Sequence, residues 1–108
     1  MTEHASHPEL AGFTDIDRLV HEPARLMLMA VLYVIDSADF TFVMNQTGLT
    51  WGNLSAHLSK LEEAGYLTLD KSFIGRRPNT SLRLTDSGRQ AFRTYRQSLM
   101  KAMENLQE

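Results

Sequence analysis

The spacing of apolar residues changes along the chain and divides it into predicted helices and strands. Residues 10–20 carry an apolar stripe that predicts a short amphipathic helix, formed by Phe13, Ile16, Leu19 and Val20. Pro23 then suits the first position of a second helix. Residues 24–35 are apolar nearly all round, so we expect this second helix to be the buried centre of the fold.

The middle of the chain predicts two short helices separated by a glycine turn. The polar residues 36–39 end the central helix, and Phe40 favours a short extended piece before Thr41 caps a helix over residues 42–47. Gly48 ends that helix. Thr50 caps the next, which covers residues 51–64 and has an apolar stripe of Leu54, Leu58 and Leu61. Two helices joined by such a turn are typical of a helix-turn-helix.

From Tyr66 onward the apolar period becomes two, which favours strands. Gly65 ends the preceding helix, and the first strand contains Leu67, Leu69 and Phe73. Residues 81–84 alternate again, so the two strands form a hairpin. The turn over residues 75–79 has Arg76 and Arg77 at its tip.

The last predicted helix has the most regular pattern. Thr85 and Asp86 cap it, and it continues to about Leu106. Its apolar residues form a seam at spacings of three and four, namely Phe92, Tyr95, Leu99, Ala102 and Leu106. The seam can pack on the first helix, on a second chain, or on both. The predicted interface of a two-fold dimer is Phe13, Ile16, Phe92, Tyr95, Leu99, Ala102, Met103 and Leu106.

This order of elements predicts an α+β, mostly α, winged helix-turn-helix. It has a two-stranded β wing and a long C-terminal dimerisation helix over about residues 86–106. With 108 residues, 43% apolar and 22% charged, the chain fits one domain with one core. We expect a flexible N-terminal arm at residues 1–9 and a single domain over residues 10–108.

Composition removes several classes of function. The chain has no cysteine, which excludes disulfides, thiolate metal sites and thiol nucleophiles. It has no glycine-rich phosphate loop and no carboxylate pair or Ser/His/Asp set spaced for catalysis, so we expect neither an enzyme nor a cofactor. The longest apolar run, residues 26–35, is too short for a bilayer, and residues 1–9 do not form a signal peptide. We therefore expect a cytoplasmic protein without membrane contact.

The net charge of −2 conceals an uneven distribution of charge. Residues 1–49 hold two basic and seven acidic side chains, whereas residues 50–101 hold nine basic and four acidic ones. Contact with a polyanion therefore depends on the second half of the chain, because a binding footprint is a local patch. A solvated basic face without a partner is the alternative interpretation.

The segment LTWGNLSAHLSKLEEAGYL, residues 49–67, resembles the recognition helix of prokaryotic winged-helix regulators of the MarR/ArsR-like kind. It is similar in particular to a short subgroup with the pattern LTxGNLSxHLxxLEEAGY. The segment KSFIGRRP at residues 71–78, with Leu84, Thr85 and Gly88, resembles the wing and the wing-to-helix junction of that subgroup. LVHEPARL at residues 19–26 is similar to its first helix boundary. The resemblance covers roughly residues 16–95 and implies a transcriptional regulator that dimerises through its last helix.

The helical wheel independently gives candidate contacts to double-stranded DNA. Opposite the leucine stripe lie small residues that let the backbone approach the major groove, and Asn53 can pair with adenine or a phosphate. Thr50 with the first free amides, and Lys60, can meet phosphates, while Arg76 and Arg77 reach phosphates or the minor groove. The predicted DNA contacts are Thr50, Gly52, Asn53, Ser55, Ala56, Ser59, Lys60, Arg76, Arg77 and Asn79.

Several of these positions have a purely structural alternative. Trp51 lies nearer the apolar side, which favours packing against the wing over a DNA contact, and His57 fits a boundary residue hydrogen-bonded to a neighbour better than a base reader. Asn53 can merely support the Thr50 cap, and the two wing arginines can be ordinary turn charges. Related regulators often carry an arginine or a long polar side chain at the positions of Ala56 and Ser59. We therefore expect modest base discrimination and a strong salt dependence.

Two other functions compete with DNA binding. A metal sensor would use a loose site of Glu3, His4, His7 and Glu9, although a set without thiolate supports it poorly. A winged helix that binds another protein is the stronger rival, and it would lose little when Arg76 and Arg77 are changed. The sequence identifies no small-molecule effector.

Overall fold

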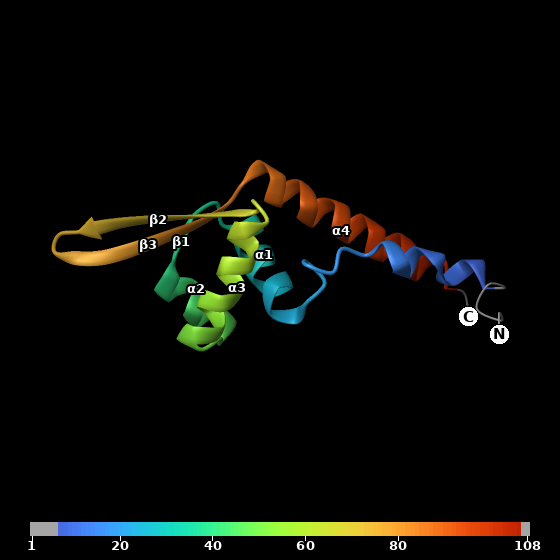
Figure 1. Cartoon of the computed structure of the whole chain (residues 1–108), viewed down its shortest axis with the longest axis horizontal. Coiled ribbons are helices and arrows are strands. Elements are labelled where there is room, and N and C mark those ends of the chain that lie inside the picture. The colour runs from blue at the N-terminus through green and yellow to red at the C-terminus, as the bar shows by residue number, and fades with distance from the viewer. Residues whose placement is uncertain (1–6, 107–108) are drawn as a thin grey trace.

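A computed structural model describes residues 7–106 and shows an elongated molecule measuring 62 × 25 × 24 Å (Figure 1). The elements follow in the order η2 (Pro8–Asp15), α1 (Pro23–Val34), β1 (Ala38–Asp39), α2 (Phe40–Thr47), α3 (Trp51–Glu63), β2 (Leu67–Ile74), β3 (Arg77–Leu84) and α4 (Asp86–Glu104). This is the predicted winged helix-turn-helix with a long C-terminal helix.

Helix α1 is the centre of the core, as its apolar sequence predicts. Pro23 begins it, and the Glu22 side chain caps it by accepting a hydrogen bond from the backbone N–H of Arg25. Leu28, Met29 and Leu32 are fully buried. The core also contains Val20, Val43 and Tyr95, together with buried leucines of α3 and of the part of β2 and β3 nearest the helices.

The predicted helix over residues 10–20 is wrong. The chain instead forms the 3₁₀-helix η2, which ends at Asp15, and then an extended residue and a turn. The carboxylate of Asp17 accepts hydrogen bonds from the backbone N–H groups of Leu19 and Val20, and this local pairing competes with helix. Ile16 and Val20 are buried all the same. Residues 1–6 of the predicted arm lie outside the described residues, and Pro8 and Glu9 belong to η2.

Helix α2 begins earlier than predicted. It begins at Phe40, and its cap is Asp39 rather than Thr41, because the Asp39 carboxylate accepts the backbone N–H of Phe42 at 2.7 Å. Gly48 ends the helix in the left-handed conformation with a φ of 75°, as the sequence indicates. Thr50 then caps α3 by accepting the backbone N–H of Asn53. The helix-turn-helix prediction is thereby confirmed.

The two-stranded wing is confirmed as β2 and β3, and a third strand joins it, so that the antiparallel sheet has the order β1-β3-β2. The additional strand β1 pairs only with Ser81 and Leu82. The wing hairpin is also longer than predicted, because Ile74 pairs with Arg77 and leaves Gly75 and Arg76 as the whole turn. Pro78 lies in β3 beyond the β1 pairing, where its missing N–H costs no hydrogen bond to β1.

Helix α4 is capped by Thr85 as predicted, and it extends away from the core beside η2 (Figure 1). We call η2 with residues 95–104 of α4 the terminal helix pair. Its packing is close, since a Cβ added at Gly12 would lie 3.2 Å from the Cβ of Ala102. Tyr95 and Ala102 are buried here by the chain itself.

Candidate nucleic-acid interface

Helix α3 presents a flat polar face to solvent. Leu54, Leu58 and Leu61 point into the core and leave the opposite side open. A Cβ added at Gly52 would find nothing within 4 Å, so the helix surface is unobstructed at that point. The exposed predicted contacts on and beside this helix are Thr50, Gly52, Asn53, Ala56, Ser59 and Lys60, with Ser55 half-buried at the margin.

The N-terminus of α3 already uses part of its hydrogen-bonding capacity. The hydroxyl of Thr50 accepts the N–H of Asn53 at 3.2 Å, and the carbonyl of Thr50 accepts that of Leu54. The amides of Trp51 and Gly52 come before the first intrahelical bond and keep their hydrogens for a ligand. The cap and the amide side chain of Asn53 thus lie together at the start of the exposed face.

His57 anchors α3 to α1, as the boundary interpretation predicts. Arg25 donates to its Nδ1 at 3.3 Å, and Glu22 Oε1 lies 3.9 Å from the same nitrogen. Arg25 also donates to the carbonyl of Leu19 at 2.6 Å. The backbone N–H of Arg25 lowers the pKa of Glu22 from its ordinary value, with burial opposing and His57 assisting. These contacts fix the orientation of α3 and leave Arg25 committed to the fold.

The wing carries most of the positive charge near α3. Strands β2 and β3 with their turn hold Lys71, Arg76, Arg77 and Arg83 against the single acidic residue Asp70. Arg76 and Arg77 are exposed at the tip, and neither enters an ion pair with any residue between 7 and 106. Helix α3 itself has Lys60 beside Glu62 and Glu63. The attraction for a polyanion therefore comes from the wing.

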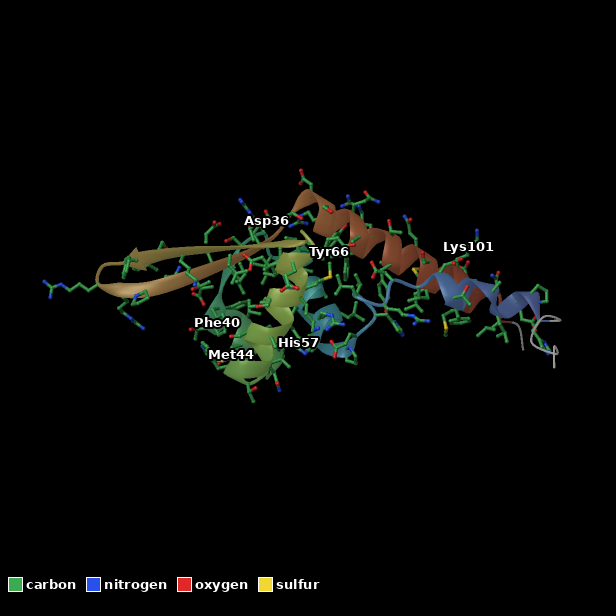
Figure 2. All side chains as sticks on the ribbon, viewed as in Figure 1. Asp36, Phe40, Met44, His57, Tyr66 and Lys101 are labelled. Carbon is green, nitrogen blue, oxygen red and sulfur yellow. The ribbon has the colours of Figure 1, made fainter. Side chains whose placement is uncertain are left out.

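The predicted DNA contacts fall into two groups, one on α3 and one on the wing. The α3 residues lie on the helical body with Phe40, Met44 and His57, whereas the wing extends well beyond that body (Figure 2). A cleft of about 420 Å³ joins the groups, and Ser55 and Asn79 both line it. A second cleft, of about 410 Å³, lies between α2 and the wing and is lined by Asn45, Arg77 and Asn79.

The structure adds two residues that the sequence did not single out as contacts, Lys71 and Thr80, and brings in Trp51, which the sequence favoured as a packing residue. Trp51, Lys71 and Thr80 line the 420 Å³ cleft between α3 and the wing. Lys71 pairs with Thr80 across β2 and β3, on the same sheet face as the Leu69–Leu82 pair. The alternation of residues 67–73 contained this signal, because Lys71 follows the two leucines at intervals of two.

The predicted dimer-interface residues divide by exposure. Ile16, Tyr95 and Ala102 are buried within one chain, and Phe92 packs on Tyr33 with ring centroids 4.9 Å apart. Tyr95 also makes a 2.8 Å hydrogen bond with His21, and burial raises its pKa. The side chains that remain available to a second chain are half-buried Leu99 and the exposed Phe13, Met103 and Leu106.

A metal site and a membrane-spanning helix have no support in the described part of the chain. Residues 7–106 contain no group of three His, Asp or Glu residues that could hold a metal. His7 lies 3.3 Å from Glu9, whereas Glu3 and His4 of the suggested metal site lie outside the described residues. No helix within the same range is long and apolar enough to cross a membrane.

Comparison with known proteins agrees with this geometry. A sequence-family model described as a winged helix DNA-binding domain matches residues 24–103. An uncharacterized protein of Methanocaldococcus jannaschii is 32% identical over 90 residues, which is 83% of this chain and 98% of that protein. The predicted resemblance to prokaryotic winged-helix regulators is confirmed.

Two solved structures share the architecture. A transcriptional regulator homologue from Pyrococcus horikoshii OT3 superposes with a TM-score of 0.81 at 29% identity, covering 93% of this chain and 98% of the other. The PcaV transcriptional regulator from Streptomyces coelicolor has a TM-score of 0.71 at 19% identity, covering 95% and 75%. In both comparisons the shared fold therefore covers nearly the whole of the present chain.

Proposed function

We propose, from the premise that the chain belongs to the winged helix DNA-binding domain family, that it binds double-stranded DNA as a homodimer and regulates transcription. The observation that carries the proposal is the arrangement of α3 and the wing. An open, small-residue helix face and a basic hairpin flank one cleft. A helix of this kind fits the major groove, while the hairpin meets the adjacent backbone.

In this proposal α3 enters the major groove with its N-terminal half. Gly52 and Ala56 allow a close approach, and Asn53 offers an amide for adenine. Thr50, Ser59 and Lys60 meet phosphates, which set the register of the helix without selecting a sequence. Discrimination by hydrogen bonds is modest, because the exposed face offers few long polar side chains.

The wing supplies most of the electrostatic attraction to DNA in this proposal. Arg76 and Arg77 have no ionic partner among residues 7–106, so neither must break a salt bridge to contact DNA. At the tip of a hairpin with eight residues in each strand they contact phosphates or the narrow minor groove of A·T-rich DNA.

A second copy of the chain would pack on the terminal helix pair. Phe13, Met103 and Leu106 leave apolar surface in water at this end of the molecule, and Leu99 is only half covered. A two-fold dimer buries that surface and places two α3 helices on half-sites about one helical turn apart.

Fluorescence anisotropy tests the proposal directly. The full chain is titrated into labelled duplexes from the region upstream of its own gene, beside a random duplex, at several salt concentrations. We expect preferential binding to one upstream fragment and an affinity that falls steeply with salt. Absence of binding to every duplex at low salt would favour the rival function, a winged helix that binds another protein.

A further inference from the structure

Trp51 is the only tryptophan of the chain, and it lies exposed at the first position of α3. Its exposed fraction is 68%, and it makes a tilted contact with Phe40, with ring centroids 6.0 Å apart. A large aromatic side chain left in water is typical of an interface anchor, because covering it releases much apolar surface at a small entropic cost.

The surroundings of Trp51 define the kind of partner that would cover it. On one side lies the open face of α3 at Gly52, and on the other the cleft of about 420 Å³ that contains Lys71 and Thr80. The indole therefore stands between the part of α3 that can enter a major groove and a cleft that combines Lys71 and hydroxyl groups with the apolar Phe40, Leu69 and Pro78. An ammonium group and hydroxyls bind a phosphate, and apolar side chains contact sugars and bases, so a nucleic-acid strand makes use of both parts of this lining.

A strand held in this cleft brings its bases to the indole. When α3 lies in the major groove, its first turn faces base edges, and the wing meets the backbone beside them. The thymine C5-methyl is the apolar group among the base-edge features of the major groove. The exposed indole of Trp51 is the large apolar group at the start of this helix face, and it matches that methyl group.

We propose that Trp51 determines specificity by packing its indole on the C5-methyl of a thymine in each half-site. This inference rests on the proposed function, since it requires α3 in the major groove. It assigns to an apolar contact the base preference that Ala56 and Ser59 do not supply. Lys71 and the hydroxyls of Ser55 and Thr80 act as positioning groups that hold the neighbouring phosphate.

Deoxyuridine, which lacks the C5-methyl, isolates this contact. The tightest duplex selected by the protein from a random pool is remade with each thymine replaced in turn by deoxyuridine, and affinity is measured by anisotropy. We expect one position per half-site to lower the affinity of the native chain about fourfold, the effect of one methyl group leaving an apolar contact. Trp51→Ala should bind at least about 30-fold more weakly and lose its response to that replacement.

The control removes an equally exposed apolar side chain elsewhere. Val34, at the end of α1, is 81% exposed, and Val34→Ala should match the native chain in affinity and in its deoxyuridine response. Trp51→Ser, which also removes the apolar ring, provides a second variant if Trp51→Ala unfolds, and thermal unfolding of each variant separates folding from binding.

The outcomes distinguish the inference from the function beneath it. If no duplex is enriched and none binds at low salt, the proposed function fails and the inference with it. If a selected duplex binds but no deoxyuridine position weakens it, the function stands and the role of Trp51 is refuted. A Trp51 variant that keeps the native deoxyuridine response refutes that role equally.

Discussion

The wing and the terminal helix pair extend from the same core in opposite directions, yet different forces hold them (Figure 1). The wing is a ladder of backbone hydrogen bonds from Leu67–Leu84 to Ile74–Arg77, and Lys71 through Pro78 are all exposed. The terminal helix pair is held by side chains, because Tyr95 is buried in the core and Ala102 packs closely on Gly12 of η2.

This difference separates folding from binding within one small protein. Wing side chains beyond Leu69 contribute little packing, so they are free for a partner and can be changed without unfolding the chain. The terminal helix pair has its inner face committed to folding and only its outer apolar side chains left over. Changes there affect stability or association according to which face they touch.

The largest expected effect lies at Gly88, where the base of the wing meets α4. A Cβ added there would overlap the carbonyl oxygen of Tyr66. That carbonyl already accepts the N–H of Thr85 at 3.0 Å, so it cannot move freely. Gly88→Ala should lower the free energy of unfolding by about 3 kcal/mol, measured by chemical denaturation.

Gly52→Ala is the matched control for this prediction. Its added Cβ meets nothing within 4 Å, and alanine is the better helix former, so stability should rise by up to about 1 kcal/mol. Equal effects of the two substitutions would show that the junction is not tightly packed.

Next in size is the association of two chains through the terminal helix pair. Met103 is 55% exposed, so Met103→Glu leaves the fold intact while placing a charge in the proposed interface. Dimerisation should weaken by about 2–3 kcal/mol, measured by sedimentation equilibrium. Gln97→Glu adds the same charge to an exposed site away from the seam and should leave the dimer unchanged. A persistent dimer in Met103→Glu would place the interface elsewhere.

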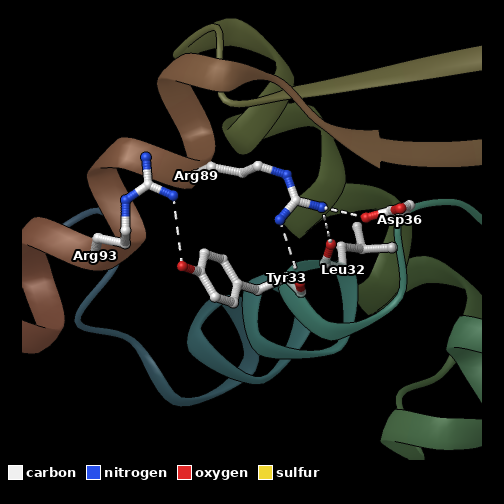
Figure 3. A network of polar contacts seen from close by, with 5 residues as sticks. All are labelled: Leu32, Tyr33, Asp36, Arg89 and Arg93. Atoms are coloured by element: carbon white, nitrogen blue, oxygen red, sulfur yellow. Dashed lines mark hydrogen bonds and ion pairs between the residues drawn. The ribbon is translucent and has the colours of Figure 1, made fainter.

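Arg89 tests the connection between α4 and the core. Its guanidinium donates to the carbonyls of Leu32 and Tyr33, at 3.3 and 3.2 Å, and to Asp36 at 3.0 Å (Figure 3). It also lies 5.3 Å from the centroid of the Tyr33 ring. Because the carbonyls at the end of α1 depend on it, Arg89→Met should cost about 2 kcal/mol in thermal unfolding.

Asp36→Asn provides the comparison for Arg89. The Asp36 side chain is 93% exposed, so water screens its ion pair and the destabilisation should stay below about 1 kcal/mol. If Asp36→Asn proved as damaging as Arg89→Met, the ion pair rather than the helix carbonyls would hold the two elements together.

The wing arginines should affect binding and leave stability alone. Changing Arg76 and Arg77 to alanine should weaken binding to every duplex roughly tenfold and lower the logarithmic salt slope by about 0.9 for each phosphate that the variant no longer neutralises. Arg96→Ala with Lys101→Ala removes the same charge from exposed α4 sites and should leave the slope unchanged. An unaltered slope in the wing variant would refute the binding of phosphates by the wing.

Local chemistry in the sequence determined most of the secondary structure and the recognition helix. Gly48, Thr50 and the leucine stripe fixed α3 to within a residue, because a left-handed turn, an N-cap and a helical period each act over a few positions. The same short range explains why Pro23 and Thr85 correctly marked the beginnings of α1 and α4. The exposed face of α3 followed from that periodicity alone.

Other features depended on contacts between distant residues, and only the tertiary structure decided them. The additional strand β1 exists because Ala38 and Asp39 meet Ser81 and Leu82, which a local pattern does not encode. The seam of α4 matched either of two partners, and its packing against η2 within the chain was settled by the close fit of Gly12 to Ala102. For Trp51 the sequence favoured packing against the wing over a DNA contact, and the fold instead leaves its indole exposed beside Lys71, since burial depends on what the rest of the chain covers.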